Sequence, residues 1–391
     1  MSGLPRAFPL ANGTPPPTPP LSGRGARRPL WLAIPTRFAG LPRRPATLVA
    51  ALLALLLALA CTALATPDPT VASSAGTGEV SDLGMYETVI AGLRGGGDYY
   101  PLAADALRSG DYPLKPFVTF RLPLHSVVQA ALSTRVTIAL LYLLAIGVGV
   151  AWWVRLRPLL PRPLARTILA LFIAGGLIAF VQADLIAFHE IWAAMLVALS
   201  LALWQPTRWI PSAALALVAM LVRETAALLP MVMLAFAMLG GARREALGWL
   251  LTLLAFALAL VAHAWGVSQV VGPLDPSSPG WTGLNGPGFF VRSLVISTVL
   301  SAIPLALAAP LVACALFGWS AWRDPLGARA AVLFLGYGAV IAIFARTNTF
   351  YWALMPAPVF LIGLVFVPDA VRDVAAALLD RRRVRVQRIT Q

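Results

Sequence analysis

The stretch SDLGMYETVIAGLRGGGDYY, residues 81–100, contains a carboxylate placed where it could act as a general base. Asp82 stands at the head of a helical pattern in which Tyr86, Val89 and Ile90 share one side. A carboxylate there could take a proton from an attacking hydroxyl. Asp is also a preferred N-cap residue, whose carboxylate accepts backbone N–H bonds. The two interpretations are compatible, because a cap would hold the carboxylate in place. We therefore treat Asp82 as the candidate catalytic residue.

A second acidic site occurs in FHEIW, residues 188–192, where His189 and Glu190 open an apolar run. An imidazole and a carboxylate there could hold a sugar, relay a proton or bind a metal. Polar groups beside an anchoring tryptophan are the simpler interpretation. Because adjacent residues point in different directions on a helix, Glu190 could share a divalent metal with Asp82 only if the fold brings the two together. The sequence leaves metal binding open.

The third group of candidates is built around two arginines. The segment LVRETAALLP places Arg223 and Glu224 between short apolar runs, where burial is costly unless the charges are paired or hydrated. Arg346 lies in FARTNTFYWALMP, where a snorkelling arginine beside an aromatic belt is the alternative. A guanidinium can donate two parallel hydrogen bonds to a phosphate, so both arginines are candidates for a lipid phosphate. The other candidate substrate-binding residues are Glu224, Glu190, His189 and Tyr86. Basic residues that could join Arg346 are Lys115, Arg121 and Arg292.

The composition indicates which elements must position these residues. The chain has 391 residues, is 59% hydrophobic and only 12% charged, and has apolar runs of membrane-spanning length from Ala46 onward. These features predict an all-α polytopic membrane protein. The net charge of +14 has an explanation other than nucleic acid, because cytoplasmic connections of membrane proteins collect arginine. We expect the lipid bilayer, and no nucleic acid, as a partner.

We expect about ten transmembrane helices and two tails. The predicted spans are residues 46–66, 135–154, 164–181, 188–204, 209–222, 225–240, 247–265, 293–318, 329–345 and 350–368. Residues 1–45 should form a disordered, basic and Pro-rich cytoplasmic tail, residues 46–368 the transmembrane domain, and residues 369–391 a basic cytoplasmic tail. With both termini inside, most of the 30 basic residues lie in inner segments and most of the 16 acidic residues lie outside. This orientation predicts a multi-pass protein of the inner (plasma) membrane.

The first predicted span and the long connection after it carry two further expectations. RRPATLVAALLALLLALACTALA resembles a signal peptide that ends at Ala63 to Ala65, but the long apolar run favours an uncleaved span. The outer loop 67–134 should contain interfacial helices, with Leu83, Tyr86 and Ile90 as their membrane anchors. The candidate residues should therefore face outward, near the membrane surface.

Taken in order, these segments resemble the GT-C superfamily of integral-membrane glycosyltransferases. The resemblance rests on SDLGMYETVIAGLRGGGDYY after the first span, the Pro-containing return FRLPLH, the acidic turn ADLIAFHE and the buried VRETAALLP. It covers residues 46–265, which would correspond to the catalytic module. Many members carry a paired acidic motif in the first loop, whereas Asp82 is flanked by Ser81 and Leu83.

The resemblance implies a periplasmic active site that moves a sugar from a polyprenyl-phosphate donor to a glycan, lipid or protein acceptor. It assigns Asp82 as base or metal ligand, Glu190 to the second acidic site, and Arg223 and Arg346 to the lipid phosphate. The resemblance assigns no cofactor with certainty; a divalent metal is the one that the family pattern allows, and the unpaired Asp82 leaves it open. The alternative from the residues themselves is a multi-span transporter or lipid flippase, in which charges in broken helices are also expected.

Overall fold

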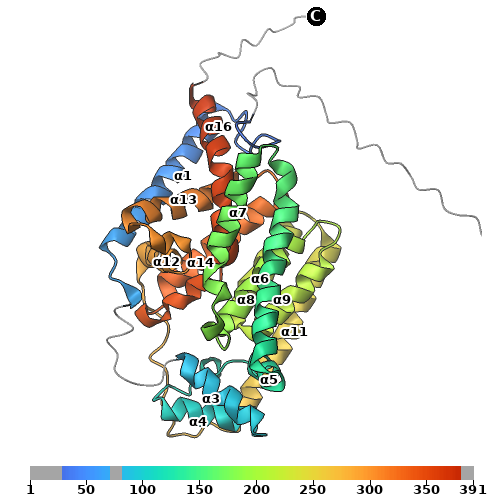
Figure 1. The fold of residues 1–391 in the computed structure, drawn as a ribbon, viewed down its shortest axis with the longest axis vertical. Helices are drawn as coiled ribbons and strands as arrows, with labels where there is room; N and C mark the ends of the chain where they lie inside the picture. The colour runs from blue at the N-terminus through green and yellow to red at the C-terminus, as the bar shows by residue number, and fades with distance from the viewer. Residues whose placement is uncertain (1–28, 71–81, 380–391) are drawn as a thin grey trace, which may run out of the picture.

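The computed structural model describes residues 29–70 and 82–379 of the chain (Figure 1). Over these ranges the protein is helical, and the one extended pairing within them is an isolated parallel bridge between Lys115 and Ser277. The prediction of an all-α protein is confirmed. Residues 1–28 of the expected N-terminal tail, Ser81 and residues 380–391 lie outside the described residues.

Five helices of the described chain are long and apolar enough to cross a membrane, by length and composition. They are α1 (Arg43–Cys61) with the 3-10 turn η1 (Thr62–Ala65), α6 (Thr134–Leu156) with η3 (Arg157–Leu159), α7 (Pro163–Leu177) with η4 (Ile178–Val181), α11 (Arg243–Ser268) and α14 (Pro325–Phe344). A sixth is added if η8 (Thr347–Leu354) and the helical stretch Ala357–Leu379, which meet at 52°, form one bent span. These helices are consistent with a membrane protein.

The expectation of ten full-length spans is not confirmed, because four of the predicted segments form five shorter helices. These are α8 (His189–Leu203), α9 (Ile210–Val222), η6 with α10 (Glu224–Ala227 and Leu228–Leu239), α12 (Gly286–Ile296) and α13 (Leu305–Ala321). The predicted span 293–318 breaks between α12 and α13, where η7 (Val299–Ala302) is followed by Pro304. A proline donates no backbone N–H and disfavours a helical residue before it, so the run cannot continue as one helix.

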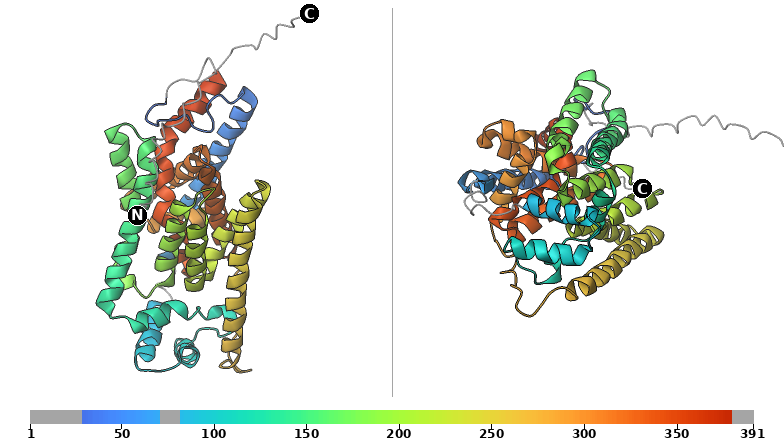
Figure 2. Two further views of the ribbon diagram at one scale, coloured as in Figure 1. Left: turned by 90° about the vertical axis from the view of Figure 1, so that its right-hand side faces the viewer. Right: turned by 60° about the horizontal axis from the view of Figure 1, so that its bottom comes forward.

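The short helices α8, α12 and α13 bury more than half of their residues, whereas the long helices α1, α6 and α11 bury few of theirs. Most residues of α8 are buried, and α8 packs against α9 and α6. The final predicted span, 350–368, is a chain of short turns made by η8, α15 (Ala357–Phe360) and η9 (Leu361–Phe366), before α16 (Val367–Leu379). In the left view of Figure 2, α6 and α11 stand at opposite sides of the bundle.

One end of the bundle is closed by residues 82–133, which we call the cap (Figures 1 and 2). The cap contains α3 (Asp82–Arg94), α4 (Tyr99–Ser109), η2 (Phe117–Thr119) and α5 (Leu124–Ala131). The apolar stripe of α3 was expected to anchor the helix in the membrane interface, and the structure places most of it elsewhere. Tyr86, Val89 and Ile90 are buried in a small core of the cap, together with Leu107 of α4. The predicted helix and its apolar side are confirmed, but this side packs against the rest of the cap.

The connection between α11 and α12, residues 269–285, is tied to the cap. Arg108 of α4 donates from Nε and Nη2 to the two carboxylate oxygens of Asp275, at 3.0 and 2.8 Å. These hydrogen bonds lower the pKa of Asp275 to about 2. The backbone of Ser278 donates to the carbonyl of Lys115 at 2.7 Å. The connection is thereby held beside the cap before it turns back toward α12.

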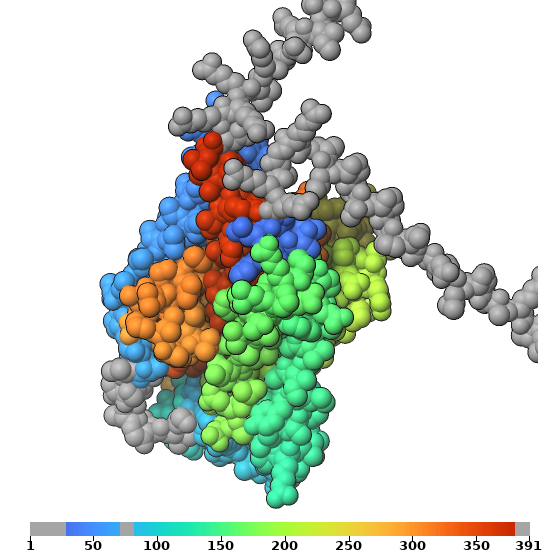
Figure 3. All heavy atoms as spheres, turned by 45° about the horizontal axis from the view of Figure 1, so that its top comes forward, coloured from blue at the N-terminus to red at the C-terminus, as the bar shows by residue number. Residues whose placement is uncertain are grey.

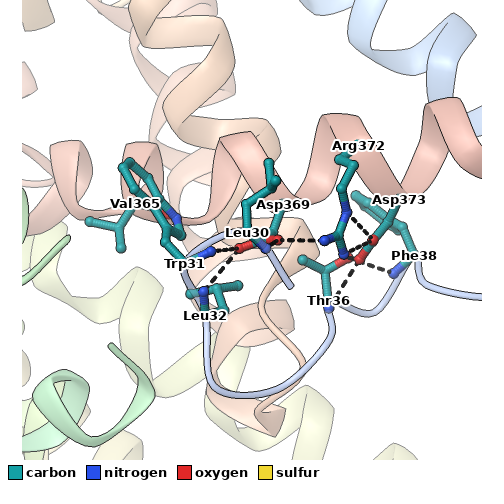
Figure 4. A network of polar contacts seen from close by, with 9 residues as sticks. All are labelled: Leu30, Trp31, Leu32, Thr36, Phe38, Val365, Asp369, Arg372 and Asp373. Carbon is teal, nitrogen blue, oxygen red and sulfur yellow. Dashed lines mark hydrogen bonds and ion pairs between the residues drawn. The ribbon is translucent and has the colours of Figure 1, made fainter. Parts of the chain in front are cut away.

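The opposite end carries the first and last described segments of the chain, packed together. Residues 29–42 were expected to be disordered, and the structure contradicts this. The carboxylate of Asp369 in α16 accepts backbone N–H groups of Leu30, Trp31 and Leu32, and Asp373 accepts from Thr36 (Figure 4). Figure 3 shows this N-terminal segment between α16 and the α6–α7 turn, to which it is also hydrogen-bonded. The predicted C-terminal tail is likewise helical up to Leu379.

Candidate functional site

A cavity of about 480 Å³ lies where the cap meets the bundle. Five segments line it: the start of α3, the cap from the end of α4 to Arg121, the junction between α9 and η6, Trp281 of the 269–285 connection, and the end of α14 with η8. Its volume is in the range of small-molecule binding sites. The cavity therefore joins parts of the chain that lie far apart in sequence.

Five of the seven candidate residues line this cavity. They are Asp82, Tyr86, Arg223, Glu224 and Arg346. The other two, His189 and Glu190, are fully buried at the start of α8. Glu190 accepts a hydrogen bond from Arg223, and the ring of His189 lies 4.6 Å from the ring of Tyr86. Lys115 and Arg292 do not join the cavity, because Lys115 binds the carbonyl of Pro273 and Arg292 binds Asp68.

Arg223 is the centre of a buried ionic network in the cavity wall. It sits at an extended residue between α9 and η6, with φ −148° and ψ 117°, which turns the side chain inward. Its Nε donates to Glu190 Oε1 at 2.6 Å, and its Nη1 pairs with Glu224 Oε1. Arg121 Nη1 lies 3.4 Å from the same Glu224 oxygen. Arg223 is 1% exposed and Glu190 0%, so this charge is neutralised inside the protein.

Arg121 also places Tyr86. The guanidinium Nε donates to the hydroxyl of Tyr86 at 3.0 Å. Burial raises the pKa of Tyr86 to about 12, with nearby charges acting in both directions. The hydroxyl therefore stays protonated at neutral pH and keeps a proton to donate.

Asp82 is held by two tyrosines. It is the first residue of α3, and its Oδ1 accepts from the hydroxyl of Tyr112 at 2.6 Å. Its Oδ2 accepts from the hydroxyl of Tyr351, in η8, at 3.0 Å. Both oxygens are thus directed toward groups that line the cavity. A carboxylate acting purely as a helix cap would instead be directed toward the backbone of its own first turn.

Arg346 differs from Arg223 in its surroundings. Among the described residues it forms no ion pair, and its guanidinium carbon lies 6.0 Å from the ring centroid of Trp281. Its Nε is one of several buried polar atoms in the cavity wall that have no hydrogen-bond partner among the described residues. The others are Thr119 Oγ1, Glu224 Oε2, Thr225 Oγ1 and Trp352 Nε1. Buried polar groups are almost always satisfied, so this set indicates a polar ligand or ordered water in the cavity.

His189 belongs to a separate, smaller chamber behind Tyr86. The chamber holds about 20 Å³, which is room for about one water. Both ring nitrogens of His189 lack a partner among the described residues, and its ring lies 4.4 Å from that of His125. The amide nitrogen of Gln129 donates to Nε2 of His125, so the proton of neutral His125 is assigned to Nδ1. These imidazoles pack behind the cavity wall and do not line the main cavity.

The side chains do not fit a divalent metal shared by Asp82 and Glu190. Among residues 29–70 and 82–379, no group of three or more His, Cys, Asp or Glu side chains is placed to hold a metal ion. Asp82 accepts from two tyrosines, and Glu190 lies against a guanidinium, which repels a second cation. We therefore derive no step through a metal.

Several residues of the cavity carry no signal in the sequence. Tyr112 and Trp281 lie in connections, and only the fold brings them to the cavity. Arg121, a secondary candidate for joining Arg346, lines the same cavity and contacts Tyr86 and Glu224 there. Tyr351 lies in the aromatic segment that follows Arg346. Its local signal was weak, because tyrosines are common at membrane boundaries.

The chain was also compared with protein families, with curated proteins and with solved structures, and none of the three comparisons finds a match.

Proposed function

We propose that this protein is a membrane glycosyltransferase. It would move a sugar from a polyprenyl-phosphate donor to a hydroxyl of a glycan, lipid or protein acceptor. The observation that carries the proposal is that the carboxylate of Asp82 and the guanidinium of Arg346 line the same cavity. A transferase of this type needs one base for the acceptor and one cation for the phosphate that leaves.

The proposed reaction is one displacement with inversion. The acceptor oxygen attacks the anomeric carbon as the bond from that carbon to the phosphate oxygen breaks. The electron pair of the broken bond leaves with the polyprenyl phosphate, and the proton of the acceptor hydroxyl passes to Asp82. Arg346 stabilises the negative charge that develops on the phosphate.

The remaining candidates support this centre. Arg223 is paired with Glu190 and Glu224, which suits it to hold the cavity wall better than to bind a free phosphate. Tyr86, placed by Arg121, offers a hydroxyl to the sugar. His189 packs behind Tyr86 and supports the position of its ring.

We further propose a GT-C-like arrangement in which the short helices count among about ten membrane segments. The cap and cavity would face the outer side of the inner membrane, with both termini in the cytoplasm. The positive-inside distribution supports this orientation. The charged groups of the cavity lie at one end of the bundle, which favours transfer over transport, since a transporter needs polar groups accessible from both faces.

The test is transfer from labelled polyprenyl-phosphate sugars by the full chain in membranes. Asp82→Asn should lower transfer about hundredfold or more, because the acceptor loses its base. The matched control is Asp105→Asn, which changes an exposed carboxylate of the cap outside the cavity and should leave transfer unchanged. Equal transfer by wild type and Asp82→Asn would show that the role of Asp82 is wrong. Absence of transfer from every donor, with unchanged surface glycans in cells lacking the protein, would reject the function.

A further inference from the structure

The two tyrosines that bind Asp82 are held in different ways. Tyr351 follows a fixed turn at the start of η8, in which Arg346 N donates to Thr349 Oγ1 at 2.8 Å and Thr349 N donates back to the carbonyl of Arg346 at 2.9 Å. Its ring packs edge-on against Phe188 at 5.0 Å. Tyr351 is therefore fixed to the short segment that also carries Arg346.

Tyr112 instead follows a tight turn after α4. Asp111 has φ +53°, a left-handed conformation that costs energy for a residue other than glycine. A Cβ at Gly110 would lie 2.8 Å from the ring of Tyr112. The ring thus lies directly over a glycine, and this turn aims its hydroxyl at Asp82.

We propose that Tyr351 is a positioning residue that fixes Asp82 relative to Arg346, and that the hydroxyl of Tyr112 occupies the place that the acceptor's hydroxyl takes during transfer. This inference rests on the proposed function and adds the place where the acceptor's hydroxyl binds and the residue that positions the base. The Tyr112 contact is an O–H donor at 2.6 Å from Oδ1, and an alcohol can form the same contact. The acceptor group is then a neutral hydroxyl.

The chemistry of Tyr112 agrees with this role. Burial, followed by the hydrogen bond to Asp82, raises the pKa of Tyr112, so it remains a phenol that donates. When the acceptor arrives, Tyr112 gives up Oδ1 while Tyr351 retains Oδ2. The proton that later passes to Asp82 comes from the acceptor, so neither tyrosine gains or loses a proton overall.

Kinetics separate the two roles, with octyl glucoside as the hydroxyl acceptor and a labelled polyprenyl-phosphate sugar as the donor. Tyr351→Phe should lower kcat about tenfold or more while the KM of the acceptor changes little, because the base is misaligned. Tyr112→Phe should lower the acceptor KM about three- to tenfold, because the acceptor no longer displaces a hydrogen bond. Gly110→Ala, which pushes the Tyr112 ring away, should resemble Tyr112→Phe. Tyr142→Phe, in α6 and outside the cavity, is the control that should change neither constant.

A second measurement requires no activity. In thermal unfolding of the full chain, Tyr351→Phe should lower the unfolding temperature in the wild type but add little in an Asp82→Ala background, since the shared bond is already lost. Additive shifts would overturn the role of Tyr351. A Tyr112→Phe protein with a raised acceptor KM, or with a kcat as low as that of Tyr351→Phe, would overturn the role of Tyr112. Coupled shifts without transfer by the wild type would reject the transferase function itself, and the catalytic roles with it.

Discussion

At the scale of single residues, Arg223 and Arg346 have different surroundings, although the sequence suggested the same phosphate-binding role for both. Arg223 is buried in contact with Glu190 and Glu224, whereas Arg346 has no carboxylate partner among the described side chains. Removing one member of a buried pair leaves the other charge unpaired, which is strongly destabilising. Removing an unpaired cation leaves no such charge behind. Substitution of Arg223 should therefore mainly lower stability, whereas substitution of Arg346 should mainly weaken ligand binding.

We predict that Arg223→Gln lowers stability by about 3–5 kcal/mol, because Glu190 is then buried without its partner. Arg346→Gln should cost less than about 1 kcal/mol, the scale of its contact with Trp281, and should weaken binding of a labelled polyprenyl phosphate about tenfold or more. Unfolding in detergent and equilibrium binding measure the two effects. The assignment is wrong if Arg346→Gln destabilises as much as Arg223→Gln, or if it binds the lipid phosphate normally.

Charged residues in apolar surroundings were the part of the site that could be predicted from sequence. Arg223 and Glu224 are costly between two apolar runs, so their presence alone pointed to a buried polar site. Asp82 was suggested by its place at the head of a helix. Tyr112 and Trp281 could not be predicted, because ordinary connection residues acquire a role only when the cap and the 269–285 connection fold over the same cavity.

At the scale of elements, the contact between α13 and η9 depends on a pair of glycines. A Cβ at Gly318 would lie 1.9 Å from the carbonyl oxygen of Gly363, and one at Gly363 would lie 2.0 Å from the carbonyl oxygen of Ala315. Helices of membrane proteins approach closely where residues are small. Any side chain here must push two backbones apart.

We predict that Gly318→Ala and Gly363→Ala each lower stability by about 1–3 kcal/mol or more, since the clash is with backbone atoms that cannot rotate away. Gly147→Ala is the matched control, because nothing lies within 4 Å of a Cβ at this helical position of α6. It should be neutral or stabilise by up to about 1 kcal/mol. The measurement is unfolding temperature in one detergent. Equal effects at all three positions would contradict the close approach of α13 and η9.

Apolar runs predicted where helices occur better than how long they are. The centres of α1, α6, α7, α11 and α14 follow directly from uninterrupted hydrophobic sequence. Hydropathy averages over Pro304, so the sequence predicted one span where the structure has α12 and α13. It placed a boundary between α9 and α10, but it did not predict the extended conformation of Arg223 there. A helix buried among other helices need not span the full apolar layer, and hydropathy does not distinguish it from one that does.

At the scale of the whole molecule, the two ends of the bundle are built differently. One end has the cap and the cavity, with its orphaned polar atoms. The other has residues 29–42 fastened to α16 and to the turns between helices (Figures 3 and 4). Composition predicted a disordered tail here because Pro, Gly and Arg are common in it. Instead, the backbone N–H groups of Leu32 and Thr36 donate to Asp369 and Asp373 of α16. Each of these bonds joins residues 337 positions apart in the sequence, so local composition could not predict them.

These two ends should lie on opposite sides of the membrane, and this can be tested without any substrate. The change is a single cysteine in a chain whose Cys61 and Cys314 are replaced by alanine. Asp105→Cys reports on the exposed surface of the cap, and Arg208→Cys on the exposed turn between α8 and α9 near the other end. An impermeant thiol reagent should label Asp105→Cys in intact cells, and Arg208→Cys only after the membrane is opened, because the distribution of basic residues over the whole chain places the α8–α9 connection inside. The chain without cysteine is the control for background labelling. If only Arg208→Cys is labelled in intact cells, the cavity faces the cytoplasm, and the proposed periplasmic transfer is excluded.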